Sequence, residues 1–104
     1  MDDDTLGGYE QVHARPPAFG AADGFAYTVS VFVDDEPDAG GRYGAALLFL
    51  RWAPGGERPI GHVETDYLAH AATPDAAAAL VAALTLHDVK AHLDRCVAGG
   101  RAAP

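Results

Sequence analysis

The sequence has little positive charge, which argues against two classes of partner. Seven Lys and Arg stand against fifteen Asp and Glu in 104 residues, giving a formal net charge of −8. Proteins bind duplex nucleic acid by neutralising its phosphates with basic side chains, and anionic membrane surfaces attract basic segments. We therefore expect neither nucleic acid nor a membrane as a partner. Solubility explains the excess of carboxylates, with a specific basic partner as the alternative.

Cysteine is almost absent as well. The single residue, Cys96, excludes an internal disulfide, and a chain without disulfides is expected in the reducing cytoplasm. The first eight residues, MDDDTLGG, lack the basic and apolar regions of a secretory signal. The longest apolar run, residues 45–50, is far too short to span a bilayer.

Familiar cofactor motifs are also missing. The sequence contains no phosphate-binding loop, dinucleotide fingerprint, serine elbow or paired-cysteine zinc motif. Alternating acids at Asp34, Glu36 and Asp38 suggest a calcium loop, but the pattern fails at Ala39 and Ala45, where glycine and glutamate are required. We therefore expect no cofactor and no bound metal.

The sequence does contain three strand patterns, and the middle one is apolar on both faces. Residues 42–52 read RYGAALLFLRW, which is typical of a central strand covered on both sides. Residues 25–34, FAYTVSVFVD, alternate between apolar and mixed positions, as a half-buried strand does. Residues 60–69 supply the third strand. Both connections are too short for a crossover, so the strands are predicted to form an antiparallel meander.

Helix signals follow the strands. Thr73, Pro74 and Asp75 mark a helix start, because threonine caps the helix, proline fits its first turn and an acid suits its positive end. Thr85 with Asp88 marks a second cap. The sequence is compatible with one long helix and with two helices separated by a break near residues 84–85.

These elements predict an α+β fold with one domain over residues 9–99. It consists of a small three-stranded antiparallel meander, followed by a C-terminal helix or broken helix pair packed on one face. A fourth strand over residues 10–15 is an alternative. The acidic residues 1–8 are expected to be disordered, and residues 100–104 are expected to form a frayed tail.

This order of elements resembles the small sheet-and-helix domain of HicB-like antitoxins. Residues 27–33, residues 43–48 and the helix from Thr73 carry the resemblance. The proline-rich segment that this family places after its second strand is missing here, and no DNA-binding region follows. The resemblance therefore implies an architecture and no function.

The two faces of the predicted sheet differ in what can cover them. Helix residues can cover one face. The other face keeps an apolar patch, and such patches mark interfaces. This patch predicts a non-enzymatic interaction or ligand-binding module that forms a homodimer, with a further protein or a small molecule as a possible partner. An N-terminal arm with Val12, Pro17 and Phe19 is the rival cover. The predicted interface residues are Phe32, Leu48, Leu50, Trp52 and Leu68.

The alternative is a small enzyme or metal-binding protein that uses a polar stripe on the third strand. His62, Glu64 and Asp66 share one strand face by alternation, and His92 on the helix is the assisting candidate. Alternate strand positions lie roughly 7 Å apart, too far for all three to bind one metal directly. A solvated sheet face explains the same pattern. Cys96 falls on the apolar stripe of Val89 and Leu93, which predicts a small buried hydrophobe rather than a nucleophile.

Overall fold

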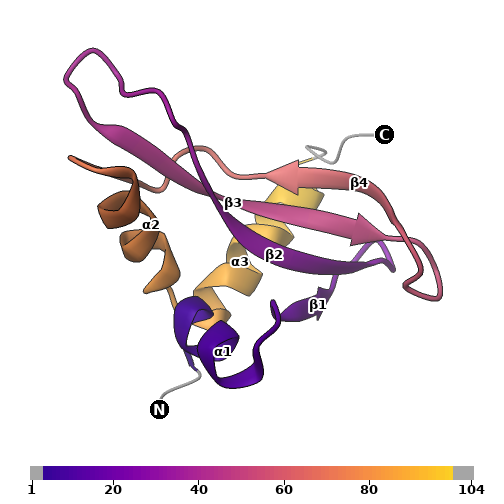
Figure 1. The fold of residues 1–104 in the computed structure, drawn as a ribbon. Helices are drawn as coiled ribbons and strands as arrows, with labels where there is room; N and C mark the ends of the chain where they lie inside the picture. The colour runs from indigo at the N-terminus through magenta and orange to yellow at the C-terminus, as the bar shows by residue number, and fades with distance from the viewer. Residues whose placement is uncertain (1–3, 100–104) are drawn as a thin grey trace.

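An antiparallel sheet with helices packed on one of its faces makes up residues 4–99, which are the residues that the computed structural model describes (Figure 1). This confirms the expected α+β class with a meander and a C-terminal helix pair. The elements in chain order are α1 (Leu6–His13), β1 (Ala18–Gly20), β2 (Ala26–Val33), β3 (Tyr43–Trp52), β4 (Pro59–Glu64), β5 (Ala69–Ala71), α2 (Pro74–Ala82) and α3 (Leu86–Ala98).

The sheet has β3 at its centre. The strand order is β1-β2-β3-β4, and β5 pairs with β3 on the same side as β4. β2 pairs with β3 over its full length, from Ala26 opposite Trp52 to Val33 opposite Ala45. β4 pairs with the second half of β3 and β5 with the first half. The third strand expected over residues 60–69 is therefore interrupted, and the residues between β4 and β5 leave the regular ladder.

One core fills the space between the sheet and the helices. Alternate residues of the strands point into it, and Leu47, Phe49 and Val63 are almost fully buried there. α2 contributes Ala77 and Val81 to the same cluster. Each large apolar side chain removed from water in this way contributes about 1.5–3 kcal/mol to folding. The other core residues are Leu6, Tyr27, Val29, Ala45, Ala71, Val89, Leu93 and Cys96.

The helix pair is broken where the second threonine cap predicted it. The Thr73 hydroxyl accepts a hydrogen bond from the Ala76 N–H at 3.1 Å, and Pro74 begins α2. The Thr85 hydroxyl accepts one from the Asp88 N–H, also at 3.1 Å, and α3 begins one residue later. Each cap satisfies a backbone N–H that the helix itself leaves unpaired.

The N-terminal segment differs from the disordered stretch expected over residues 1–8. Leu6 has 0% of its surface exposed and lies in the core. Its N–H donates to the Leu84 carbonyl at 2.9 Å, and the Leu86 N–H donates to the Asp4 carbonyl at 2.7 Å. The break between α2 and α3 leaves backbone groups that need partners, and residues 4–6 supply them. Residues 1–3 lie outside the described part of the chain, as do residues 100–104, where the frayed tail was expected.

Residues 10–15 form a helix end rather than a strand. The Thr5 hydroxyl accepts a hydrogen bond from the Gly8 N–H at 3.0 Å and starts α1, which runs to His13. The helix ends at Ala14, which is in the left-handed conformation with φ 55°, before the Pro16-Pro17 pair. The fourth strand exists, but it is β1 beyond these prolines, because a proline pair blocks a helix and permits an extended chain after it.

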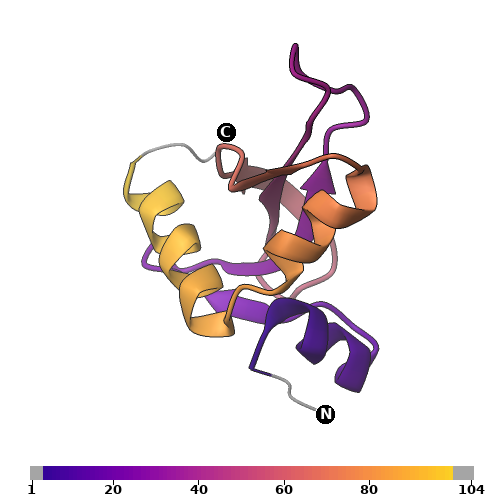
Figure 2. The same cartoon turned by 90° about the vertical axis from the view of Figure 1, so that its left-hand side faces the viewer.

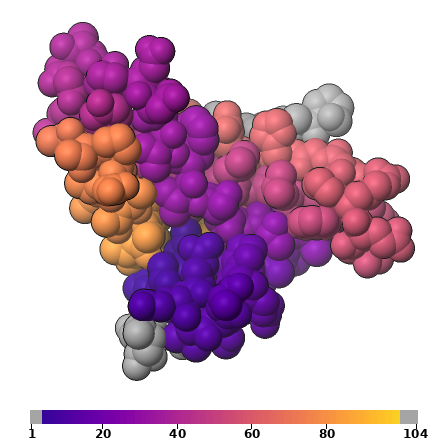
Figure 3. Space-filling view, in the orientation of Figure 1, coloured from indigo at the N-terminus to yellow at the C-terminus, as the bar shows by residue number. Residues whose placement is uncertain are grey.

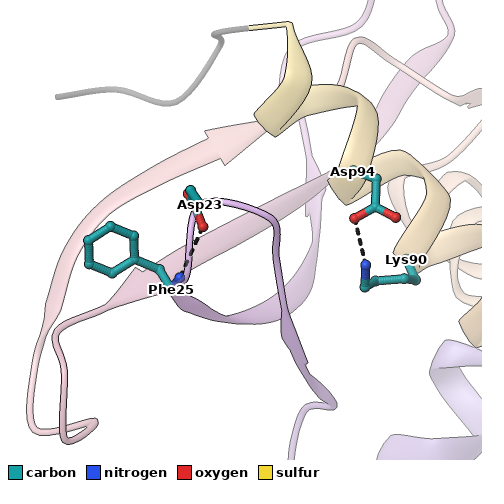
Figure 4. A network of polar contacts seen from close by, with 4 residues as sticks. All are labelled: Asp23, Phe25, Lys90 and Asp94. Carbon is teal, nitrogen blue, oxygen red and sulfur yellow. Dashed lines mark hydrogen bonds and ion pairs between the residues drawn. The ribbon is translucent and has the colours of Figure 1, made fainter.

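Polar contacts secure the chain outside the core (Figure 4). The Asp23 carboxylate accepts hydrogen bonds from the Phe25 N–H at 3.0 Å and from the Tyr27 hydroxyl at 2.5 Å, which holds the turn between β1 and β2. Burial raises the pKa of Tyr27 to about 12, and the bond to Asp23 acts in the same direction. On α3, Lys90 pairs with Asp94 at 2.6 Å. This exposed i,i+4 pair adds only about 0.3–0.5 kcal/mol.

Within residues 4–99, no helix has the length and apolar content needed to cross a bilayer.

We predict that Leu6→Ala destabilises the protein by about 2–5 kcal/mol, because it leaves a cavity where the N-terminal segment meets the helix junction. Val12→Ala removes an apolar side chain of α1 that is 46% exposed, so its cost should stay below about 1 kcal/mol. Urea unfolding of both variants measures the difference. Equal unfolding midpoints for the two variants would show that Leu6 is not part of the core.

Candidate functional site

The face of the sheet away from the helices is the most prominent feature outside the core. α2 and α3 lie in front of the strands in Figure 2, and α1 packs against α2. In the view of Figure 3, which is turned by 90° from that of Figure 2, the strands lie at the surface and largely hide α3. No helix of residues 4–99 packs on this face, which we call the open face. The strand residues on it include Ala26, Thr28, Ser30, Phe32, Gly44, Ala46, Leu48, Leu50, Trp52, His62 and Glu64.

An apolar stripe from β3 runs along the open face. Leu48, Leu50 and Trp52 are half-buried, and none of them is among the residues that form the core or pack against it. Polar neighbours flank the stripe: Leu50 lies between Thr28 and His62, and Leu48 lies between Ser30 and Glu64. The Trp52 indole N–H donates to the Thr28 hydroxyl at 2.9 Å. The indole is thereby held in place, and its apolar surface belongs to the open face.

Phe32 also belongs to the open face, where it pairs with Ala46 and is 42% exposed. Of the arm residues named as the rival cover, Phe19 packs against the core and Val12 of α1 is 46% exposed, so neither side chain covers this face. Four of the five predicted interface residues are thus on the open face.

The expected placement of Leu68 on this face is wrong, because its side chain packs against the core. The cause is the irregular connection between β4 and β5. The Thr65 N–H donates to the Leu47 carbonyl and the Thr65 hydroxyl accepts from the Leu47 N–H, both at 3.0 Å. The next backbone bond joins the Leu68 N–H to the Ala45 carbonyl at 2.8 Å. Residues 65–68 therefore lie opposite only residues 46–47 of β3, and the alternation that placed Leu68 on the open face does not hold there.

Tyr67 lies on the open face, where alternation had placed Leu68. In a regular strand Tyr67 would face the helices together with Val63, but its side chain is 46% exposed and its ring lies on Gly44 of β3. A Cβ at Gly44 would stand only 2.8–2.9 Å from three ring carbons, so no residue but glycine fits beneath this ring. An aromatic ring laid over a strand glycine replaces the packing that the glycine lacks.

The Tyr67 hydroxyl donates to the Asp34 carboxylate at the end of β2. This bond lowers the pKa of Asp34 and raises the pKa of Tyr67. The His70 ring touches the Tyr67 ring edge-on, with centroids 5.6 Å apart. Tyr67 is therefore fixed on three sides: by Gly44 below, by Asp34 at its hydroxyl and by His70 at its edge.

Two cavities lie on either side of the connection between β4 and β5. The cavity on the open face has a volume of about 250 Å³, and Phe32 and Tyr67 supply its aromatic lining. The cavity on the helix side has a volume of about 440 Å³ and lies against α3. Thr65 and Asp66 line both. The remaining residues of the first are Ala46 and Glu64, and those of the second are Leu68, His92, Arg95, Cys96 and Gly99.

The candidate catalytic and metal-binding residues are spread over these places. His62 and Glu64 lie on the open face, Asp66 lies in the irregular connection, and His92 lines the helix-side cavity. Among residues 4–99, no three His, Cys, Asp or Glu side chains come close enough together to hold a metal ion.

His92 has a positively charged neighbour. Its Nδ1 lies 2.9 Å from Nη2 of Arg95. Burial lowers the pKa of His92, and the Arg95 charge lowers it further, whereas Asp88 acts in the opposite sense. A neutral imidazole is therefore favoured at this cavity.

The sequence interpretation missed Gly44, Tyr67 and Asp34. One signal for Gly44 was available. A lone glycine inside an otherwise apolar strand often marks a close approach by another group. The identity of that group could not be read from alternation, because Tyr67 lies in the part of the chain where alternation fails.

Comparison of this chain with protein-family models, with curated proteins and with solved structures finds no match. The resemblance to HicB-like antitoxins accordingly stays one of element order.

We predict that the cost of Gly44→Ala depends on Tyr67. In the wild-type background the new methyl group must displace the ring, which should cost about 1–3 kcal/mol. In a Tyr67→Ala background the space is open, and the same change should be neutral or stabilising by about 0.4–1 kcal/mol. Urea unfolding of the single and double variants gives the coupling energy. Tyr67→Phe is the control, because it keeps the ring and should keep the cost. A Gly44→Ala effect that is the same in all three backgrounds would contradict the contact.

We predict slow labelling of Cys96 by a thiol reagent in the native protein. The side chain is buried on α3, and its Sγ makes a weak hydrogen bond of 3.6 Å to the Glu64 carbonyl. Because the chain has no other cysteine, the stoichiometry reports on this residue alone, and labelling should accelerate in urea. Complete labelling within seconds under native conditions would show that Cys96 is an accessible, activated thiol.

Proposed function

We propose that this protein is a non-enzymatic interaction module that associates with a second copy of itself through the open face. The observation that carries the proposal is the apolar stripe of Leu48, Leu50 and Trp52, which lies at the centre of the sheet and which no helix of residues 4–99 covers. A strand that is apolar on both faces normally lies between two layers. A second copy of the sheet is the simplest second layer.

The polar residues beside the stripe favour a second copy of the same chain. On β4, His62 is the cross-strand neighbour of Leu50, and Glu64 is the cross-strand neighbour of Leu48. A two-fold axis across β3, between these two leucines, would set Leu48 against the partner's Leu50. The same axis would set Glu64 against the partner's His62. The flanking residues are thus complementary to themselves, which a symmetric interface requires.

The alternative of a small enzyme or metal-binding protein has less support. The side chains that it needs lie on two sides of the sheet rather than around one cavity; they are His62, Glu64, Asp66 and His92.

The proposal also places the protein in the cytoplasm, which is supported by a single, buried cysteine.

We predict that Leu50→Asp abolishes self-association and leaves the monomer folded. A carboxylate in the middle of the stripe would have to be buried without a partner in the dimer, whereas in the monomer it faces water. Leu80→Asp is the matched control, since Leu80 of α2 is 54% exposed and lies away from the open face. Sedimentation velocity at several micromolar concentrations measures the mass, and circular dichroism checks the fold. The wild type and Leu80→Asp should be dimers.

A wild-type protein that stays monomeric at high micromolar concentration would refute self-association. Dimer loss in both variants would show that association follows overall charge rather than the open face.

A further inference from the structure

We propose that the open-face cavity between Phe32 and Tyr67 binds a cationic side chain, Arg or Lys, from a basic segment of another protein. This site goes beyond the self-association proposed above and does not depend on it. Its residues come from β2, β3 and the connection between β4 and β5, and none of them belongs to the stripe of Leu48, Leu50 and Trp52.

The cavity has aromatic walls and a small floor. Phe32 and Ala46 are cross-strand neighbours, and Ala46 is only 3% exposed although it is on the open face. The Tyr67 ring has one face on Gly44, and its 46% exposure leaves the other side of the side chain toward solvent. An exposed ring face attracts a cation through its quadrupole. The contacts of Tyr67 with Gly44 and Asp34 hold the ring in place before any ligand arrives, which lowers the entropic cost of binding.

The polar lining of the cavity is acidic. Glu64 and Asp66 line it together with Thr65, and the Asp34 carboxylate is held nearby by the Tyr67 hydroxyl. The hydrogen bond to Asp34 is the main cause of the raised pKa of Tyr67, and the negative charge of Glu64 acts in the same direction. None of the residues lining this cavity is Arg or Lys. Carboxylates beside aromatic faces form a site for an ammonium or guanidinium group and disfavour an anion.

The size of the cavity indicates a side chain rather than a complete small molecule. Its volume of about 250 Å³ falls below the range of about 300–1,000 Å³ that is usual for small-molecule sites. The net charge of −8 favours a basic partner over an acidic one, because it speeds the approach of positively charged proteins. A basic peptide segment that inserts one Arg or Lys into the cavity satisfies size and charge together.

The test uses a peptide with a single cation. The probe is Ac-Gly-Ser-Arg-Ser-Gly-NH2, and the control is the same peptide with citrulline, which has the shape of arginine without its charge. Titration of the full-length, ¹⁵N-labelled protein should shift the amide signals of Phe32, Ala46, Thr65 and Tyr67. The citrulline peptide should leave these signals in place. Equal shifts with both peptides would overturn the cation site, and so would shifts that avoid the four residues.

Charge-matched variants separate the cavity from the general acidity of the protein. Glu64→Gln and Glu57→Gln each remove one negative charge, but Glu57 lies in the exposed turn between β3 and β4. We expect Glu64→Gln to weaken binding of the arginine peptide about fivefold and Glu57→Gln less than about twofold. Phe32→Leu, which keeps an apolar side chain and removes the ring, should also weaken it. Equal losses for Glu64→Gln and Glu57→Gln would overturn the proposal.

The same titration on Leu50→Asp separates this site from self-association. The cavity does not include Leu50, but the proposed dimer would use Glu64 as well, so the arginine peptide should bind Leu50→Asp at least as tightly as it binds the wild type. Loss of binding in a folded Leu50→Asp variant would overturn the cavity as an independent site. Retained binding in a wild type that proves monomeric would support the cavity and refute only the dimer.

Discussion

The central strand β3 is apolar on both faces, and the described chain covers only one of them. On the helix side, Leu47 and Phe49 are fully buried in the core. On the other side, Leu48 and Leu50 are half-buried between polar neighbours. Full burial of a large apolar side chain contributes roughly 1.5–3 kcal/mol, and covering the exposed part of these side chains would gain a part of that free energy. This unequal covering is the physical reason why the open face, rather than the core, is the place to look for function.

The irregular connection between β4 and β5 shapes both cavities. Thr65 makes hydrogen bonds with both the carbonyl and the N–H of Leu47. The chain then turns so that Tyr67 points outward and Leu68 points toward the core. A regular strand would have done the reverse. The connection thereby builds one cavity on the open face and another against α3, with Thr65 and Asp66 lining both. Interruptions of this kind re-aim side chains beside functional sites in many sheets.

The junction between α2 and α3 is tied to the beginning of the described chain. Thr5 and Thr85 each cap a helix, and they also face each other in a β-bridge. The neighbouring bonds of Leu6 with Leu84 and of Leu86 with Asp4 complete this contact. Both caps are short-range features of the sequence, and the Thr85 cap was predicted from it. Their pairing joins residues about eighty positions apart, and no local pattern reports on such a contact.

The sequence by itself determined the α+β class, the meander around β3, the capped and broken helix pair and the burial of Cys96, because these follow from alternation, helical spacing and capping along the chain. It also identified four residues of the open face. Only the tertiary structure decided that Leu6 is a core residue and that Tyr67 rather than Leu68 faces outward. It likewise decided that His62, Glu64, Asp66 and His92 do not surround one site. Side chains alternate between the two faces of a sheet only while the strand stays regular. The two extra residues in the connection between β4 and β5, opposite β3, are enough to break that alternation.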